Sequence, residues 1–205
     1  MVLLHHLRIG RSLFCVWQLE ELGIDYDLKI YERDPQTMRA PASLKQAHPL
    51  GKSPVIEDGD ILLSESSAIT TYLLEKYDRD HRFWPRRDNL AEWARFTQWL
   101  HYPEGSVFVP LIMRMLLLRS GEPHVAITPF SEGELKLHFD HISAQLGDNE
   151  FILGDTFTAA DFGISYMVSM AQRLQALDPY PELASYLERN RSRPAWQRAV
   201  ARAGE

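Results

Sequence analysis

The stretch that decides the fold of this chain is LGKSPVIEDGDILLSESSAITTYLLEKY, residues 50–77. Pro54 stands at the first position of a short apolar strand, where a proline removes no hydrogen bond from the ladder. Asp58 and Gly59 are a two-residue turn signal, and apolar, largely β-branched residues flank them on both sides. This pattern predicts a β-hairpin with its turn at Asp58 and Gly59.

A helix is expected directly after the hairpin. Residues 64–67 read Ser-Glu-Ser-Ser, which is typical of a helix start. Apolar and aromatic residues then recur at spacings of three and four, at Ala68, Ile69, Tyr72, Leu73 and Tyr77. The spacing predicts an amphipathic helix that begins close to Ser66, with its N-terminus at the same end as the Pro54 loop.

The start of this helix has the chemistry to hold a small zwitterion. Backbone N–H groups at a helix start, together with the hydroxyl group of Ser66, suit a carboxylate, and Glu65 suits an ammonium group. Ser53 is held extended by the proline that follows it and offers its backbone to a peptide. Together these features suggest a γ-glutamyl peptide as the ligand. The alternative is that Glu65 and Ser66 only cap the helix.

The remainder of residues 1–79 alternates strand and helix signals. Before the hairpin the expected order is a strand, a helix, a strand and a short helix, at Val2–His5, Ser12–Leu22, Tyr26–Tyr31 and 43–47. This order predicts an α/β domain in which helices cover a mixed sheet.

A second domain of a different class is expected after a linker. Residues 80–88 are rich in charge, contain Pro85 and are expected to link the domains. From residue 89 onward the apolar positions have helical spacing, so residues 89–205 are expected to form an all-helical domain. Thr158 and Asp161 have the spacing of a capping box, which predicts a helix start and gives Asp161 a structural role rather than a catalytic one.

Composition argues against several classes of function. The net charge of -6 disfavours nucleic acid as a partner, and we interpret the arginines between positions 189 and 202 as a solvated helical face. The longest apolar run, residues 107–118, contains Pro110 and Arg114 and is too short to span a membrane. No N-terminal signal peptide is recognisable. The single cysteine, Cys15, is expected to be buried in a helix, which favours a reducing, cytoplasmic location.

Glu134, His138 and His141 fall on one face of a predicted helix, a spacing that metal ligands can have. No fourth ligand lies nearby in the sequence, and polar helix faces are common. We therefore expect no metal site.

Three separated segments resemble the glutathione S-transferase family. Residues 50–77 are similar to the family's glycine-lysine-x-proline segment and to the glutamate-serine pair that follows it. The other two segments are LHHLRIGRSLFCVWQLEELGIDYD, residues 4–27, and FILGDTFTAADFGIS, residues 151–165. A fourth segment resembles the family less specifically. It is similar to the long fourth helix of a branch of the family found in bacteria and fungi, and it reads HYPEGSVFVPLIMRMLL at residues 101–117.

The resemblance implies a thioredoxin-like N-terminal domain with a mixed four-stranded sheet, followed by an all-helical domain. It implies that Pro54 is cis, that Ser53 pairs with the cysteinyl backbone of glutathione beside Lys52, and that Glu65 and Ser66 hold the γ-glutamyl head. It also implies a symmetric homodimer whose contact is lined by the helix after Glu65 and the fourth helix.

The chemistry implied by this family is activation of a thiol, because only the thiolate attacks electrophiles well. The loop of residues 8–12 precedes the first helix and can supply a cation, a hydroxyl group and backbone N–H groups. In the branch that the chain resembles a serine commonly precedes the arginine, but here that position is Gly10. Arg11 and Ser12 are the remaining candidates for stabilising the thiolate, unless Ser12 only caps the helix and Arg11 is a surface cation.

The expected function is conjugation of glutathione to small hydrophobic electrophiles. Four aromatic and methionine residues are candidates for the wall of the electrophile site, although such residues at helical spacing are more often plain core: Tyr102, Phe108, Met113 and Met115. A catalytically silent glutathione-binding module is one alternative, which Gly10 favours. Glutathione-dependent peroxide or disulfide reduction is another, but it usually needs a reactive protein thiol at the helix start.

Overall fold

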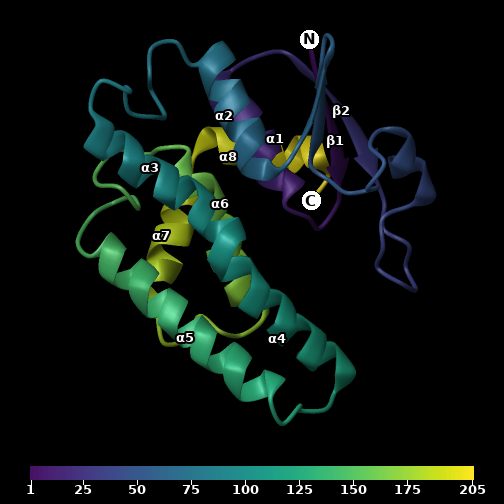
Figure 1. Cartoon of the computed structure of the whole chain (residues 1–205), viewed down its shortest axis with the longest axis vertical. Helices are drawn as coiled ribbons and strands as arrows, with labels where there is room; N and C mark the ends of the chain where they lie inside the picture. The colour runs from purple at the N-terminus through teal and green to yellow at the C-terminus, as the bar shows by residue number, and fades with distance from the viewer. The chain divides into compact units, whose positions relative to one another are not determined.

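The computed structural model describes residues 1–205 and divides into two compact units. The first unit contains Met1–Arg82 together with Arg191–Glu205, and the second contains Phe83–Asn190. Figure 1 shows the strands in the first unit and a bundle of helices in the second.

The first unit contains the predicted mixed sheet. Its strands are β1 (Val2–Leu7), β2 (Tyr26–Tyr31), β3 (Val55–Asp58) and β4 (Ile61–Ser64), in the spatial order β2-β1-β3-β4. β1 and β2 are parallel, whereas β1 with β3 and β3 with β4 are antiparallel. The prediction of a mixed four-stranded sheet is confirmed.

The hairpin turn lies one residue later than predicted. Asp58 is still part of β3 and pairs with Ile61, so the two turn residues are Gly59 and Asp60. Gly59 has a φ of 63°, which a glycine adopts without strain. The buried carboxylate of Asp58 accepts a hydrogen bond of 2.6 Å from Lys76 on the following helix. This contact holds Asp58 inside the unit, where a turn residue would face solvent.

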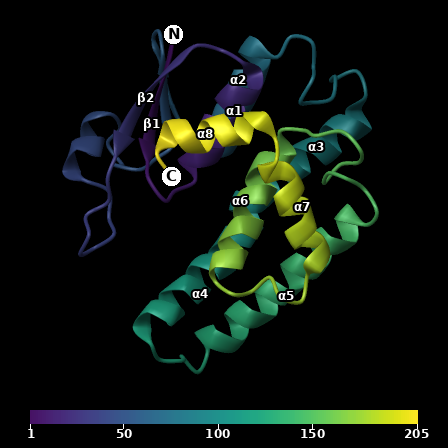
Figure 2. The ribbon, with the colours of Figure 1, turned by 180° about the vertical axis from the view of Figure 1, so that it is seen from behind.

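Three long helices accompany the sheet: α1 (Ser12–Leu22), α2 (Ser66–Tyr77) and α8 (Pro194–Ala203). A short 3₁₀ helix, η1 (Ala42–Gln46), lies where a short helix was predicted. Nine of the residues of α1 are buried, and Cys15 among them is 0% exposed. Both views show α8 beside α1 (Figures 1 and 2), so α1 is enclosed between helices as well as by the sheet. The prediction that Cys15 is a buried core residue is confirmed.

Helix α8 belongs with the sheet, which corrects the expectation that residues 89–205 form one helical domain. Arg193 donates hydrogen bonds of 2.6 Å and 3.0 Å to the two carboxylate oxygens of Glu21 on α1. The indole rings of Trp17 and Trp196 meet edge to face at 5.1 Å. The guanidinium of Arg202 lies 3.8 Å from the ring centroid of Tyr26. Arg193 and Arg202 therefore bind the sheet unit, so the arginines of this segment are only in part the solvated face that the sequence suggested, although Arg198 and Arg202 remain exposed.

The second unit is helical, as predicted. It contains α3 (Leu90–Tyr102), a π-helical turn η2 (Pro103–Val107), α4 (Phe108–Ser120), α5 (Ile127–Leu146), α6 (Ala160–Arg173) and α7 (Pro181–Arg191). Arg191, the last residue of α7, is grouped with the sheet unit. The π turn begins at Pro103, which has no N–H group to donate in the helix. Fully buried aromatic side chains fill the core between these helices, among them Trp99, Phe139, Phe162 and Tyr186. None of the helices is both long and apolar enough to cross a membrane.

The start of α6 confirms the structural role predicted for Asp161. Its Oδ2 atom accepts a hydrogen bond of 2.8 Å from the backbone N–H of Thr158. Its Oδ1 atom accepts hydrogen bonds from the backbone N–H of Ile152 (2.9 Å) and from the hydroxyl group of Tyr186 (2.8 Å). The side chain is completely buried, and burial raises the pKa of Asp161 while these hydrogen bonds oppose the shift. Asp161 therefore joins the helix start to a loop and to α7.

Candidate functional site

Strand pairing brings the two predicted glutathione segments together at one edge of the sheet. Val55 at the start of β3 pairs with Ser64 at the end of β4, so Pro54 and Glu65 extend from neighbouring strand ends. The peptide bond between Ser53 and Pro54 is cis, as the resemblance implied. Segments more than ten residues apart in the sequence therefore meet beside the N-terminus of α2.

Ser53 is fixed by the neighbouring strand β1. Its hydroxyl group donates a hydrogen bond of 2.7 Å to the carbonyl oxygen of His5 and accepts one of 3.1 Å from the backbone N–H of Leu7. Pro54 is buried and Lys52 is exposed. The hydroxyl group of Ser53 thus holds its loop against β1, while Lys52 faces solvent.

Glu65 and Ser66 mark the start of α2, where the sequence predicted it. Glu65 occupies the N-cap position and makes no side-chain capping hydrogen bond. Its φ of 71° is unusual for a residue other than glycine, and its side chain is exposed. Ser66 is the first helical residue and is buried. Glu65 therefore caps the helix only through its backbone carbonyl oxygen, which accepts a hydrogen bond of 2.9 Å from the N–H of Ile69. Its carboxylate faces solvent beside the positive end of the helix dipole.

The loop before α1 follows directly after β1, the strand that holds Ser53. Its residue Gly10 is tightly enclosed: a Cβ atom there would lie 2.7 Å from the carbonyl oxygen of Leu7. Real Cβ atoms do not approach backbone oxygen atoms so closely, so this loop has no room for the serine that the resemblance led us to expect at this position. Arg11 is the N-cap residue of α1 and is partly buried.

Ser12 is oriented toward the interior. It is 0% exposed, and its hydroxyl group lies 2.9 Å from Nδ1 of His6 and accepts a hydrogen bond of 3.2 Å from the N–H of Leu7. It is the first residue of α1 and not its N-cap. These contacts give Ser12 a structural role, and direct contact of its hydroxyl group with a thiol stays a prediction.

The predicted electrophile-site residues lie on α3 and α4 of the helical unit. Tyr102 ends α3, and its hydroxyl group is 2.6 Å from Nδ1 of His138 on α5. Burial raises the pKa of Tyr102, and the negative charge of Glu134 raises it further. Phe108, Met113 and Met115 lie on α4 and are partly buried.

The polar face of Glu134, His138 and His141 is packed against aromatic side chains of α3. Nε2 of His138 is 3.5 Å from a carboxylate oxygen of Glu134. The imidazole ring of His141 stacks on Trp99 with 5.3 Å between the ring centroids. Burial lowers the pKa of His138, which favours its neutral form. His138 and His141 therefore contact aromatic side chains of α3, and Glu134 lies beside His138 on α5.

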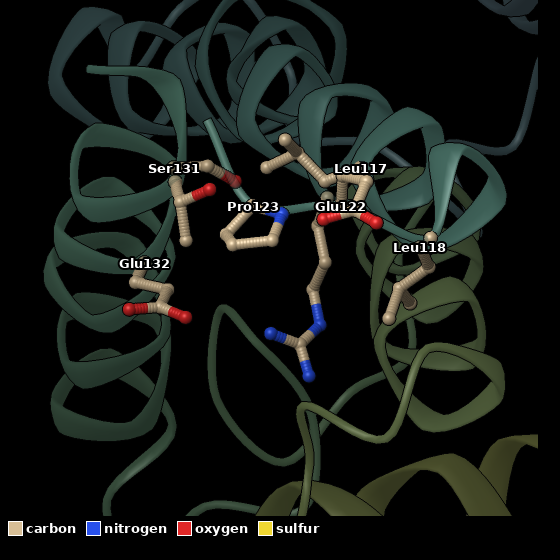
Figure 3. Close-up of a pocket in the computed structure, with 9 residues that line it drawn as sticks. Leu117, Leu118, Glu122, Pro123, Ser131 and Glu132 are labelled. Carbon is tan, nitrogen blue, oxygen red and sulfur yellow. The ribbon is translucent and has the colours of Figure 1, made fainter. Parts of the chain in front are cut away.

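A pocket of about 250 Å³ lies at the end of α4 and the beginning of α5, and it contains none of the predicted site residues. Figure 3 shows it open between the two helices, with Glu122 and Glu132 on opposite sides. Arg114 in its wall donates to the carbonyl oxygens of Leu174 (2.9 Å) and Gln175 (3.2 Å). The complete lining is Arg114, Leu117, Leu118, Gly121, Glu122, Pro123, Thr128, Ser131 and Glu132.

Sequence reasoning missed two residues that bind the loop before α1. Arg33 donates hydrogen bonds to the carbonyl oxygens of Arg8 and Ile9, each 2.9 Å long. Glu205 accepts a hydrogen bond of 2.7 Å from the N–H of Ile9. No local pattern indicates such contacts, because Glu205 is 196 positions away from Ile9 along the chain.

Comparison with known proteins gives a consistent result for both units. Residues 1–75 match the family model described as glutathione S-transferase, N-terminal domain, and residues 127–189 match that of the C-terminal domain. Glutathione S-transferase 3 of Schizosaccharomyces pombe is 33% identical over 95% of this chain and 85% of its own length. Glutathione S-transferase 1 of Saccharomyces cerevisiae is 28% identical over 92% of this chain and 89% of its own length.

Solved structures agree with these sequence relationships. The crystal structure of a glutathione S-transferase from Actinobacillus pleuropneumoniae covers 100% of this chain and 93% of its own, with 33% identity and a TM-score of 0.90. A glutathione transferase homologue from Lodderomyces elongisporus, solved with two glutathione molecules per subunit, has a TM-score of 0.83. It is 20% identical and covers 98% of this chain and 97% of its own, a likeness of fold.

Proposed function

Because this chain belongs to the glutathione S-transferase family, we infer that it is a glutathione transferase, and we propose how its residues bind and activate the tripeptide. One observation carries the binding proposal: the pairing of β3 with β4 sets the Ser53–Pro54 loop beside Glu65 and Ser66. Both signs of charge and an extended backbone segment are then available within one small area, which suits a peptide with a zwitterionic end.

Each end of glutathione has its own set of residues in this proposal. Glu65 pairs with the α-ammonium group of the γ-glutamyl head, and Ser66 with the start of α2 binds its α-carboxylate. The backbone of Ser53, before Pro54, pairs with the cysteinyl residue, and Lys52 adds a cation beside it. The cysteinyl sulfur then lies near the loop before α1.

The thiol is activated at the start of α1. Arg11 and the backbone N–H groups of this helix start favour the thiolate over the thiol, because both present positive charge to it. Ser12 is the second predicted residue here, and its buried hydroxyl group supports the loop through His6 and Leu7. The thiolate forms a carbon–sulfur bond with the electrophile, and a leaving group such as chloride departs with the electron pair.

The electrophile is a small hydrophobic molecule in this proposal. Tyr102, Phe108, Met113 and Met115 supply an apolar and polarisable wall on α3 and α4. Such pliable linings suit sites that accept several substrates. The fully buried single cysteine is consistent with a reducing location, and we propose that the protein works in the cytoplasm.

We also propose a symmetric homodimer, the commonest assembly of soluble proteins. Large apolar side chains are exposed on β4, α4 and α5, among them Leu62 (50%), Leu116 (55%), Phe130 (54%) and Leu137 (60%). Light scattering of the purified protein tests the proposal, since a dimer has twice the mass of 23.7 kDa. A monomeric mass at micromolar concentration contradicts it.

Retention on immobilised glutathione, followed by conjugation of chlorodinitrobenzene, tests the activity. A transferase is retained and releases chloride, whereas the silent module that Gly10 favours is retained without turnover. Calorimetry with glutathione should detect binding at millimolar concentration or below. Absence of any heat of binding contradicts the proposed site.

Two substitutions locate the binding residues. Glu65→Gln and Ser66→Ala should each raise the glutathione Kd about tenfold or more, because a hydrogen bond to a charged group is lost. Asp60→Asn removes one carboxylate from the exposed hairpin turn, at the opposite end of β4 from Glu65, and should leave Kd unchanged. Equal Kd values for all three variants contradict the assignment.

A further inference from the structure

Ile9, in the loop before α1, has a backbone conformation that its own side chain cannot stabilise. Its φ is 54°, in the left-handed region that β-branched residues very rarely adopt. The residue is 57% exposed, so burial of its side chain does not hold it there. Contacts to its backbone must therefore offset the strain.

Charged side chains bind the backbone of Ile9 on both sides. Its N–H group donates a hydrogen bond of 2.7 Å to Oε1 of Glu205, and its carbonyl oxygen accepts one of 2.9 Å from Nη2 of Arg33. Hydrogen bonds with an ionised partner are stronger than neutral ones. The same guanidinium donates through Nε to the carbonyl oxygen of Arg8 and through Nη1 to that of Met38, both at 2.9 Å. Its planar fork thus joins the loop to residues 33–39.

Glu205 is itself held in place from the interior. Its side chain is 14% exposed, and Oε1 lies 3.2 Å from the fully buried Nε2 of His6. Nε2 of His6 has no hydrogen-bond partner, so this approach is a close contact without a hydrogen bond. The other nitrogen of His6 is 2.9 Å from the hydroxyl group of Ser12. These contacts do not make a hydrolytic triad of Glu205, His6 and Ser12, because Ser12 is 0% exposed.

We propose that Arg33 and Glu205 are positioning residues of the thiol site. The inference rests on the proposed function. By holding Ile9 in its left-handed conformation they fix the path of Gly10 and Arg11. They thereby set where the guanidinium of Arg11 and the N–H groups at the start of α1 meet the sulfur of glutathione. Neither residue touches glutathione.

Four variants and a matched control test this role. Glu205→Ala and Arg33→Ala remove each contact, whereas Glu205→Gln keeps an acceptor and Arg33→Lys keeps a charge. Glu32→Gln is the control, because Glu32 is 68% exposed and pairs at 3.1 Å with the side chain of Arg8, away from the Ile9 backbone. The measurements are the glutathione Kd by calorimetry, kcat and KM for chlorodinitrobenzene, and the dependence of kcat/KM on pH.

Both alanine variants should lose about tenfold or more in kcat, since small displacements of catalytic groups are costly. Their pH profiles should shift upward because the bound thiol ionises less readily. Kd should stay within about threefold of wild type, because the residues proposed to hold the peptide ends are untouched. Glu205→Gln and Arg33→Lys should recover part of kcat, and Glu32→Gln should match the wild type.

Wild-type kcat and an unshifted pH profile in both alanine variants overturn the inference. A loss of kcat matched by an equal weakening of Kd, with no pH shift, also overturns it, because it indicates general damage to the unit. If the alanine variants do not fold, the same measurements on Glu205→Gln and Arg33→Lys decide whether the inference holds. A wild-type protein that binds no glutathione overturns the proposed function, and the inference with it.

Discussion

At the scale of single residues, the packing of the loop before α1 explains why position 10 is a glycine and not the serine that the resemblance implied. The site for a Cβ atom is occupied by the backbone of Leu7 at 2.7 Å and by Nη2 of Arg33 at 3.3 Å. Backbone cannot rotate away as a flexible side chain can. The missing hydroxyl group therefore cannot be restored by one substitution while this loop keeps its conformation.

Gly10→Ser should lower the free energy of unfolding by about 1–3 kcal/mol, the usual cost of forcing atoms into a packed site. It should not raise kcat, because the loop must shift to accept the new side chain. Urea unfolding and the chlorodinitrobenzene assay measure the two effects.

Gly133→Ser is the matched control, since a Cβ atom at Gly133 meets nothing within 4 Å. Its unfolding midpoint should equal that of the wild type or exceed it. A Gly10→Ser protein with an unchanged midpoint and a higher kcat would show that the loop opens freely.

At the scale of elements, Asp58 ties the hairpin to α2. It accepts hydrogen bonds from Lys76 (2.6 Å), Tyr77 (2.8 Å) and Tyr72 (3.1 Å), all on that helix. Burial raises the pKa of Asp58, but these hydrogen bonds lower it more, so its pKa lies below the usual value. The hairpin and α2 carry the two predicted halves of the glutathione site, so this cluster also maintains the distance between them.

The lowered pKa of Asp58 has a consequence for stability against pH. A carboxyl group with a lower pKa in the folded state stabilises the fold above its unfolded pKa of about 3.9, and this contribution disappears as pH falls through the folded pKa. The wild type should therefore lose more unfolding free energy than Asp58→Asn between pH 6 and acid pH. At pH 7 the variant should be less stable by about 1–3 kcal/mol. Parallel curves of stability against pH for the two proteins would exclude this role.

At the start of α6, Asp161 connects separate segments through hydrogen bonds, as Asp58 does in the sheet unit. Asp161→Ala leaves the N–H groups of Thr158 and Ile152 and the hydroxyl group of Tyr186 without their acceptor, which should cost about 3 kcal/mol or more. The exposed Asp155→Ala is the control and should change stability by less than about 0.5 kcal/mol. Thermal and urea unfolding measure the stability of both variants. Unchanged melting of Asp161→Ala contradicts the structural role.

Local patterns predicted most elements but not their exact ends. The strand, helix and hairpin signals of residues 1–77 correspond to β1, α1, β2, β3, β4 and α2. The turn signal at Asp58 and Gly59 was wrong by one residue, because the side chain of Asp58 is bound by a helix that the turn pattern does not describe. Likewise Ser12 was a candidate N-cap, but its hydroxyl group binds His6, a partner from the neighbouring strand.

At the scale of the whole molecule, the last helix is the part that the sequence did not place. The helical spacing of residues 194–203 predicts a helix. Nothing in it indicates that the helix returns to the sheet unit, where Arg193 binds Glu21 of α1, 172 positions earlier in the chain. Likewise, no sequence pattern indicates the hydrogen bond between Glu205 and the N–H of Ile9. Pairings over such separations depend on the three-dimensional path of the chain, so local patterns could suggest binding residues for the site but not the residues that support its loop.

The sheet unit should fold only when α8 is present. Residues 1–82 joined through a long flexible linker to residues 191–205 should melt cooperatively, whereas residues 1–82 alone should expose the apolar surface of α1 and bind a hydrophobic dye. Circular dichroism and dye fluorescence compare the two proteins.

A Glu21→Gln, Arg193→Gln version of the linked protein removes the bidentate ion pair and should melt at a lower temperature. Equal cooperative melting with and without residues 191–205 would show that α8 is dispensable for this unit.

The return of α8 and Glu205 to the sheet also determines when the thiol loop can form during synthesis. A ribosome makes Ile9 early and Glu205 196 codons later, after all of the helical unit. Until then α1 lacks one of its covering helices and the loop lacks one of its two anchors. A nascent chain therefore carries an unfinished sheet unit until residues 191–205 have been made, and chaperones have that whole period in which to bind it.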